Sequence, residues 1–163
     1  MKKIAFYLPQ FHQEKLNESI WGINFTDWIT SQNSTPLFKG HVQPKRPVEE
    51  PYDLLDINVL ENHCKQAKTL GLDGFSFYFY SFDKNLSALR KPIDNYLASD
   101  IDFPFCITWA NHSWTKAWIG QPNIVIAAQK YDNEQISIFC DEIIPFLEDP
   151  RYIKINDRPI LVI

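Results

Sequence analysis

The chain alternates between short, continuously apolar runs and longer stretches with helical spacing of apolar residues. The apolar runs cover residues 4–8, 75–80, 105–109 and 160–163. Because they are apolar throughout, they are typical of strands buried on both faces of a parallel sheet. Apolar residues recur every three or four positions over 57–70, 86–98 and 133–147, which predicts amphipathic helices. Gly71 can end the first helix, and Asp132 or Asn133 can cap the third. The order predicts an α/β fold with parallel strands.

The predicted connections are unequal in length. Helix-to-strand links are short, as at 71–74 and 99–104, whereas the first and third strand-to-helix links far exceed ordinary loop lengths. In a (β/α) barrel the strand-to-helix loops gather at the face that carries the active site. An open doubly wound sheet would also bind ligands at its strand ends, but the chain contains neither a Gly-x-Gly-x-x-Gly motif nor a Gly-Lys-Ser/Thr loop. A dinucleotide or P-loop function is therefore not supported.

Composition and charge narrow the classes of function. The 163 residues are 45% apolar and 15% aromatic, enough for one folded domain. The net charge is only −4, and the Lys and Arg residues are scattered along the chain. We therefore expect no nucleic-acid partner and no anionic lipid surface. No segment approaches membrane-spanning length, and the first apolar stretch is interrupted at Pro9, too early for a signal-peptide core. Cys64, Cys106 and Cys140 lie in apolar patterns and are expected to be buried, reduced thiols in a cytoplasmic protein.

Aromatic and short polar side chains collect at and after the predicted strand ends. Rings interleaved with hydrogen-bonding groups suit the apolar faces and hydroxyl rim of a sugar. The candidate substrate-binding residues are Gln10, His12, Trp21, His41, Tyr78, Tyr80, Trp109, Asn111 and Trp114. Each Trp can equally be a packing residue of a long loop, and His12 and His41 are either bases and donors or structural histidines. His63, inside the first predicted helix, is expected to be structural.

Glycosidic chemistry normally uses two carboxylates, and only Asp27 and Asp83 lie near strand ends. They are either a catalytic pair or turn-capping and sugar-binding groups, so the catalytic residues stay unknown. The Asp-x-Asp at Asp100 and Asp102 precedes a strand, which places it at the opposite face, and we discount it. The spacing of His, Cys and Asp does not resemble a zinc or iron site, and we expect no metal and no cofactor.

Several motifs in succession resemble one family. They are Ala5-Phe6-Tyr7-Leu8-Pro9-Gln10-Phe11-His12, Trp21-Gly22 with Phe25-Thr26-Asp27-Trp28, residues 36–44, Gly71-Leu72-Asp73-Gly74-Phe75, Phe103-Pro104-Phe105-Cys106, Trp109-Ala110-Asn111 and Asp149-Pro150-Arg151-Tyr152-Ile153. Over nearly its whole length the chain is similar to WbsX-type proteins and to glycoside hydrolase family 99. The resemblance implies a (β/α)8 TIM barrel that acts as a glycosyltransferase or glycoside hydrolase in lipopolysaccharide or capsule polysaccharide assembly, with a glycan as substrate.

The chain also departs from the family pattern. His112 and Ser113 stand where the family usually has Glu-Asn, and Asp27 stands where it has Glu. The later acidic Trp-Asn-Glu-Trp segment does not occur, and family members are about twice as long. We therefore expect residues 1–163 to be a single incomplete barrel domain of about four β/α units, truncated in the fourth strand.

An incomplete barrel leaves two alternatives for the function. The half-barrel either supplies the glycan-binding wall of an enzyme completed by a second chain or by self-association, or it is a non-catalytic binding remnant or inactive product. Open sheet edges and an uncovered apolar face favour association.

Overall fold

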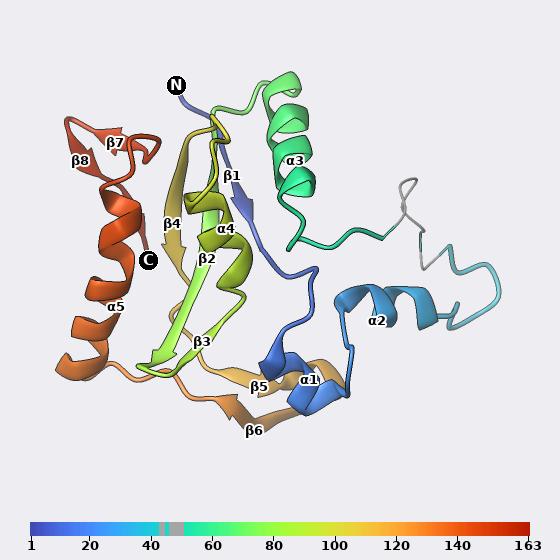
Figure 1. The fold of residues 1–163 in the computed structure, drawn as a ribbon. Helices are drawn as coiled ribbons and strands as arrows, with labels where there is room; N and C mark the ends of the chain where they lie inside the picture. Colours follow the sequence, from blue (N-terminus) through green and yellow to red (C-terminus); the bar gives the residue numbers. More distant parts are fainter. Residues whose placement is uncertain (43–44, 46–50) are drawn as a thin grey trace.

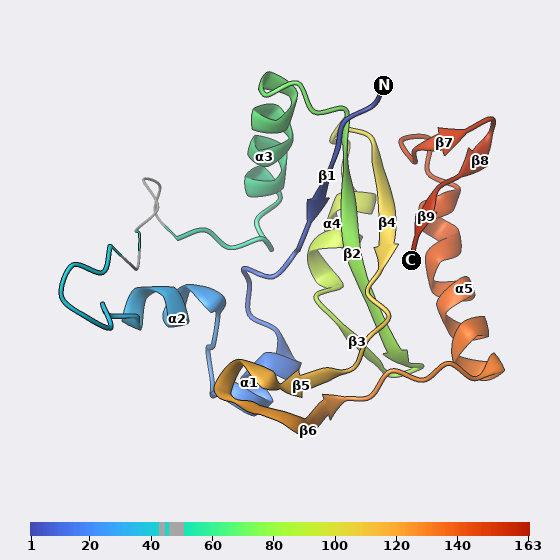
Figure 2. The same cartoon turned by 180° about the vertical axis from the view of Figure 1, so that it is seen from behind.

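The computed structural model describes residues 1–42, 45 and 51–163, and at Trp118 the backbone alone. Its centre is a parallel sheet with the strand order β1-β2-β4-β9 (Figures 1 and 2). The strands are β1 (Ile4–Tyr7), β2 (Gly74–Asp83), β4 (Phe105–Trp109) and β9 (Leu161–Val162). This confirms the predicted parallel α/β fold and its four strands.

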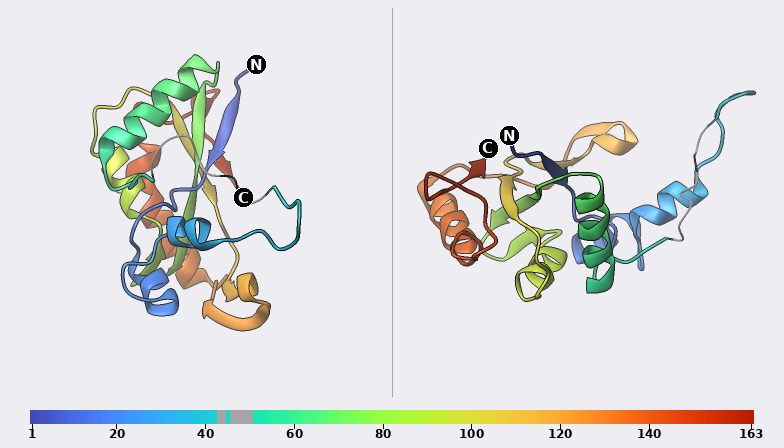
Figure 3. Two further views of the ribbon diagram at one scale, coloured as in Figure 1. Left: turned by 90° about the vertical axis from the view of Figure 1, so that its right-hand side faces the viewer. Right: turned by 90° about the horizontal axis from the view of Figure 1, so that it is seen from above.

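Three helices cover one face of this sheet (Figure 3). They are α3 (Ile57–Thr69), α4 (Lys91–Leu97) and α5 (Asn133–Leu147). Phe75, Phe77 and Phe79 alternate along β2 and enter the core between the sheet and the helices. In the part of the chain that the structure describes, no helix has the length and apolarity needed to cross a lipid bilayer.

The predicted helix ends are largely confirmed. The Asp132 carboxylate accepts a hydrogen bond from the Gln135 backbone N–H (2.9 Å) at the start of α5. Gly71 follows α3 with φ +76°, a left-handed conformation that glycine adopts without steric cost.

The helix expected over 86–98 is wrong at its start. Leu86–Ala88 form a strand, β3, which pairs antiparallel with the extended end of β2, and α4 begins only at Lys91. Helical spacing was present in the sequence, but backbone pairing with β2 and Pro92 in the first turn of α4 decide the boundary.

Two long loops and the last helix-to-strand link contain short elements that the sequence pattern did not predict. The first loop holds α1 (Lys15–Trp21) and α2 (Asp27–Asn33). The loop after β4 holds β5 (Trp114–Lys116), the 3-10 turn η1 (Ala117–Ile119) and β6 (Gln121–Ala127), and the last helix-to-strand link holds β7 (Lys154–Ile155) and β8 (Arg158–Pro159). At seven residues or fewer, these elements are too short to show a clear period.

All three cysteines are unpaired, but the expectation that all are buried is wrong. Cys64 and Cys106 are buried, whereas Cys140 is exposed. On α5 the buried positions follow the stripe of Gln135, Phe139, Ile143 and Phe146, and Cys140 lies off that stripe.

The second face of the sheet carries none of the described helices. Phe6, in register with Ser76 of β2, projects from it and is 63% exposed. A parallel sheet with helices on one face matches one side of a (β/α) barrel, and the half-barrel itself stays a prediction.

Candidate functional site

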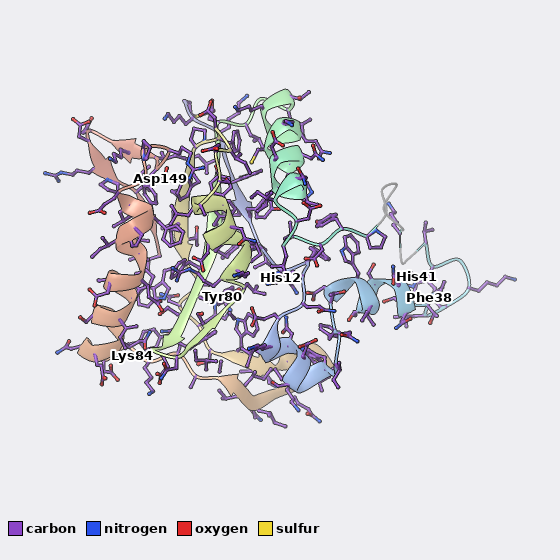
Figure 4. All side chains as sticks on the ribbon, viewed as in Figure 1. His12, Phe38, His41, Tyr80, Lys84 and Asp149 are labelled. Atoms are coloured by element: carbon purple, nitrogen blue, oxygen red, sulfur yellow. The ribbon has the colours of Figure 1, made fainter. Side chains whose placement is uncertain are left out.

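The carboxyl end of β1 leads into a turn that gathers polar side chains of the first loop. Successive backbone hydrogen bonds, Gln10 N–H to Leu8 O (2.9 Å) and His12 N–H to Gln10 O (2.8 Å), fold this turn tightly. Figure 4 shows His12 beside the end of β1, toward the middle of the molecule. The carboxyl end of the sheet, where a barrel carries its active site, therefore contains the Pro9-Gln10-Phe11-His12 motif.

Gln10 and Asp27 form one half of this polar cluster. Asp27 is the first residue of α2, and its Oδ1 accepts a hydrogen bond from Gln10 Nε2. Its other oxygen, Oδ2, is buried without a hydrogen-bond partner among the described residues. Burial raises the pKa of Asp27, while the Gln10 hydrogen bond opposes the rise. Asp27 is therefore a stronger base than an exposed aspartate.

His12 and Glu14 form the other half. His12 is 1% exposed, and neither of its ring nitrogens has a hydrogen-bond partner in the part of the chain that the structure describes. Its Nε2 lies 3.8 Å from Glu14 Oε2, an ion-pair distance that is too long for a hydrogen bond. The imidazole beside it lowers the pKa of Glu14, and that carboxylate also accepts the Leu89 backbone N–H (3.2 Å).

Glu14 was missed at the sequence level, although a signal for it exists. His12 and Glu14 are separated by one residue, and Glu14 is extended (φ −131°, ψ 128°). Two residues at that spacing in extended backbone point to the same side. The His-x-Glu spacing is thus a sequence signal for the pair, but the extended conformation of Glu14 is known only from the structure.

An aromatic cluster lies at the carboxyl end of β2, next to the polar one. Tyr80 contacts Trp114 edge-to-face at 5.1 Å between ring centroids, and exposed His112 at 5.9 Å. Burial raises the pKa of Tyr80, so its hydroxyl stays protonated as a donor. Leu89 packs within this cluster and also binds Glu14, so it links the two groups.

Tyr78 lies on the uncovered face of the sheet. Its ring stacks on Phe6 of the neighbouring strand, with centroids 5.6 Å apart and planes at 25°. Tyr78 is half-buried and Phe6 is exposed, so the two rings form an accessible aromatic surface.

Trp109 lies on the opposite face of the sheet. It pairs in register with Phe79, which faces the helices, and its indole stacks on Phe139 of α5 at 4.3 Å. Trp109 therefore packs against a helix in this structure, which was one of the two roles considered for each tryptophan. Its Nε1 is buried without a hydrogen-bond partner among the described residues.

Trp21 and Asn111 make local contacts. The Trp21 ring packs on Phe25 at 5.9 Å, and the Asn111 backbone oxygen accepts the Tyr131 hydroxyl (2.6 Å).

His41 lies apart from the polar cluster. It stacks on Phe38 at 4.6 Å, and its Nδ1 accepts the Leu37 N–H (3.1 Å). Figure 4 shows this pair at the outer end of the first loop. Gln43, Pro44 and Pro47 of the same loop lie outside the described residues.

Asp27 and Asp83 are not brought together. Asp83 ends β2 and faces Lys130 Nζ at 3.4 Å, whereas α2 lies on the other side of the molecule (Figures 1 and 2). His63 contributes to packing, as expected, because its Nδ1 lies 2.7 Å from the hydroxyl of the half-buried Tyr7. Residues 1–42, 45 and 51–163 contain no group of three or more His, Cys, Asp or Glu placed to hold a metal ion.

Comparison with known proteins gives one family. The model of the family described as "Glycosyltransferase WbsX" matches residues 3–163. The proteins called "Uncharacterized protein WxcX" from Xanthomonas campestris pv. campestris strain B100 and from a second strain are each 35% identical over 162 residues. The alignment covers 98% of this chain but only 23% of each relative. No solved structure matches.

Proposed function

The chain belongs to the WbsX glycosyltransferase family, and from this premise we propose that it is part of a carbohydrate-active protein of bacterial surface-polysaccharide synthesis. Residues 1–163 form one unit in this proposal, corresponding to about four β/α units of a barrel wall. The helices α3, α4 and α5 support it, because they cover one face of the sheet as they would in a barrel. The glycan then lies at the carboxyl ends of the strands, next to the last aromatic rings of the uncovered face.

The stacked pair of Phe6 and Tyr78 is the observation that carries this proposal. The two adjoining rings offer an apolar platform on the uncovered face of the sheet. Beyond the end of β1, the strand that contains Phe6, the hydrogen-bonded side chains of Gln10 and Asp27 offer polar groups. Sugars need that combination because their ring faces are apolar and their edges are hydroxylated.

A cytoplasmic location fits the same proposal. The three thiols are unpaired, as is usual in a reducing compartment.

Saturation-transfer NMR with a panel of monosaccharides and nucleotide-activated sugars tests the binding surface directly. Phe6→Ala should weaken sugar binding about tenfold, because it removes one stacking platform. Leu70→Ala is the control: Leu70 is also exposed (78% against 63%), but it follows α3 and lies away from the strand ends that carry the candidate site. Equal effects of the two substitutions, or no binding by the wild type, would contradict the proposal.

A second candidate function is glycan binding without catalysis. Its support is that Asp83 pairs with Lys130 at the end of β2, away from α2 and Asp27, an arrangement that does not favour a glycosidase pair. The chain should then be assayed for glycosyl transfer and hydrolysis with and without a polypeptide that supplies the rest of the proposed barrel. Turnover in a one-to-one complex would establish the enzyme, whereas sugar binding without turnover in either sample would establish the binding module.

A further inference from the structure

We propose that Glu14 contacts the substrate and that its carboxylate accepts hydrogen bonds from the hydroxyls of a neutral sugar, with His12 as the positioning residue behind it. This deepens the carbohydrate activity proposed above and rests on it. It assigns a binding role to an acid of the first loop and a chemical class to the sugar.

Glu14 lies at the carboxyl end of the sheet, beside the aromatic rings of the candidate site. Its Oε2 accepts the Leu89 N–H at 3.2 Å, and Ala88, the preceding residue, pairs in register with Tyr80 of β2. Leu89 and Tyr80 also belong to one apolar cluster, against which Trp114 packs. A hydrogen bond and a strand register therefore join the acid to the rings.

The groups around the Glu14 carboxylate hold one of its oxygens. Oε2 is bonded to the Leu89 N–H and lies 3.8 Å from His12 Nε2. Leu89 has a φ of +56° although it is bulky and buried, and such strain is concentrated at functional sites. His12 is 1% exposed, and neither of its ring nitrogens has a hydrogen-bond partner among the described residues, which is uncommon for buried polar atoms. A strained backbone and an unpaired imidazole thus surround this one carboxylate.

The Glu14 carboxylate keeps acceptor capacity for a ligand. Its side chain is 18% exposed and that of His12 only 1%, so Glu14 is the member of the pair that a ligand can reach. A carboxylate accepts up to about four hydrogen bonds, and among the described residues only the Leu89 N–H donates one to this side chain. The His12 imidazole lowers the pKa of Glu14 more than burial raises it. The group is therefore an ionised acceptor with unused lone pairs.

The charge of Glu14 and the ring beside it indicate a neutral sugar. A sugar hydroxyl can donate to Oε1 while the apolar face of the sugar packs on Trp114, the half-buried ring that meets Tyr80 edge-to-face at 5.1 Å. A uronic acid would bring a second carboxylate against Glu14, and like charges at an interface repel. Glu14 then both binds neutral sugars and discriminates against acidic ones.

Carboxyl-detected NMR of the full chain tests the contact, with glucose, galactose and mannose as neutral probes and glucuronic acid as the acidic one. A neutral sugar should shift the Glu14 carboxyl resonance but not that of Glu61, an exposed acid on α3 paired with Lys65 at 2.8 Å. Glu14→Gln keeps an oxygen for the Leu89 N–H, so it should fold. It should weaken neutral-sugar binding about tenfold through the loss of a charge-assisted hydrogen bond, and it should remove the discrimination against glucuronic acid. The control Glu61→Gln should change neither.

His12→Gln tests the positioning role. It should raise the titration midpoint of Glu14, because the imidazole lowers that pKa in the wild type, and it should weaken neutral-sugar binding. An unchanged midpoint would reduce His12 to a packing residue and overturn its part in the proposal.

The role of Glu14 is overturned if a bound sugar leaves its resonance unshifted, or if Glu14→Gln weakens binding of glucuronic acid and of the neutral sugars equally. If Glu14→Gln does not fold, the resonance shift in the wild type decides. Saturation transfer on the same samples separates the two proposals. Sugar binding that leaves Glu14 unshifted rejects this inference alone, whereas a wild type that binds no sugar rejects the proposed carbohydrate activity as well.

Discussion

Removing the Arg151 side chain should destabilise the whole fold. Its guanidinium lies at the amino end of the sheet, remote from the candidate site, and donates to the carbonyl oxygens of Leu97 (3.0 Å), Ser99 (2.9 Å) and Ile101 (2.9 Å). It also pairs with Asp149 at 2.7 Å, with the two side chains only 14% and 9% exposed. One residue therefore joins the end of α4 to the segment after α5.

The magnitude follows from these contacts. A hydrogen bond to a charged donor contributes about 1.5–3 kcal/mol, and breaking a buried ion pair costs about 3–5 kcal/mol. Because these contacts share one guanidinium and are not additive, we expect Arg151→Ala to lower the free energy of unfolding by about 3–5 kcal/mol. Arg151→Lys should recover only part of this, since an ammonium lacks the planar fork that reaches several carbonyls at once.

Urea denaturation followed by circular dichroism measures the difference, with Arg158→Ala as the control because Arg158 is exposed on β8. A loss below about 1 kcal/mol for Arg151→Ala, or full recovery by lysine, would refute the reasoning. The result also bears on the Asp-Pro-Arg-Tyr motif at 149–152, which these contacts explain as structural.

Three other outcomes are expected. Trp109→Ala should lower the free energy of unfolding by about 3 kcal/mol through lost stacking on Phe139 while sugar binding in saturation-transfer NMR persists, and lost binding in the folded variant would contradict this. Gly74→Ala should cost about 1–3 kcal/mol by urea titration, since its Cβ would lie 2.7 Å from Pro104 O; unchanged stability would show that the backbone gives way. The Arg151 guanidinium lowers the pKa of Asp149, so the pair stabilises the fold fully above the ordinary aspartate pKa, and this stabilisation is lost as the pH falls through the lower native pKa. Asp149→Asn should therefore flatten the loss of stability at acid pH. An unchanged loss would exclude the pair as its cause.

The main elements followed from the sequence because their signals are local. Continuous apolar runs marked β1, β2, β4 and β9, and helical periodicity marked α3 and α5. The unequal loops also pointed to the sheet edge where Gln10, His12 and Asp27 lie. Short elements such as α1 and the β5-β6 hairpin carry too few residues to show a period.

The face on which each aromatic lies was decided only by the tertiary structure. In Phe75-Ser76-Phe77-Tyr78-Phe79-Tyr80 nearly every position is aromatic, so no polar alternation distinguishes the two faces. Pairing with β1 and β4 placed Tyr78 beside Phe6 on the uncovered face and Trp109 on the helix face.

The polar cluster likewise depended on contacts between distant parts of the chain. The sequence by itself determined the layered α/β architecture and named His12 and Asp27, because hydrophobic pattern and residue type are local properties. It could not supply the contact of Glu14 with Leu89, 75 residues away, or the burial that raises the pKa of Asp27. Burial and long-range hydrogen bonds exist only once the chain has packed, and so the tertiary structure alone decided which of these groups act together.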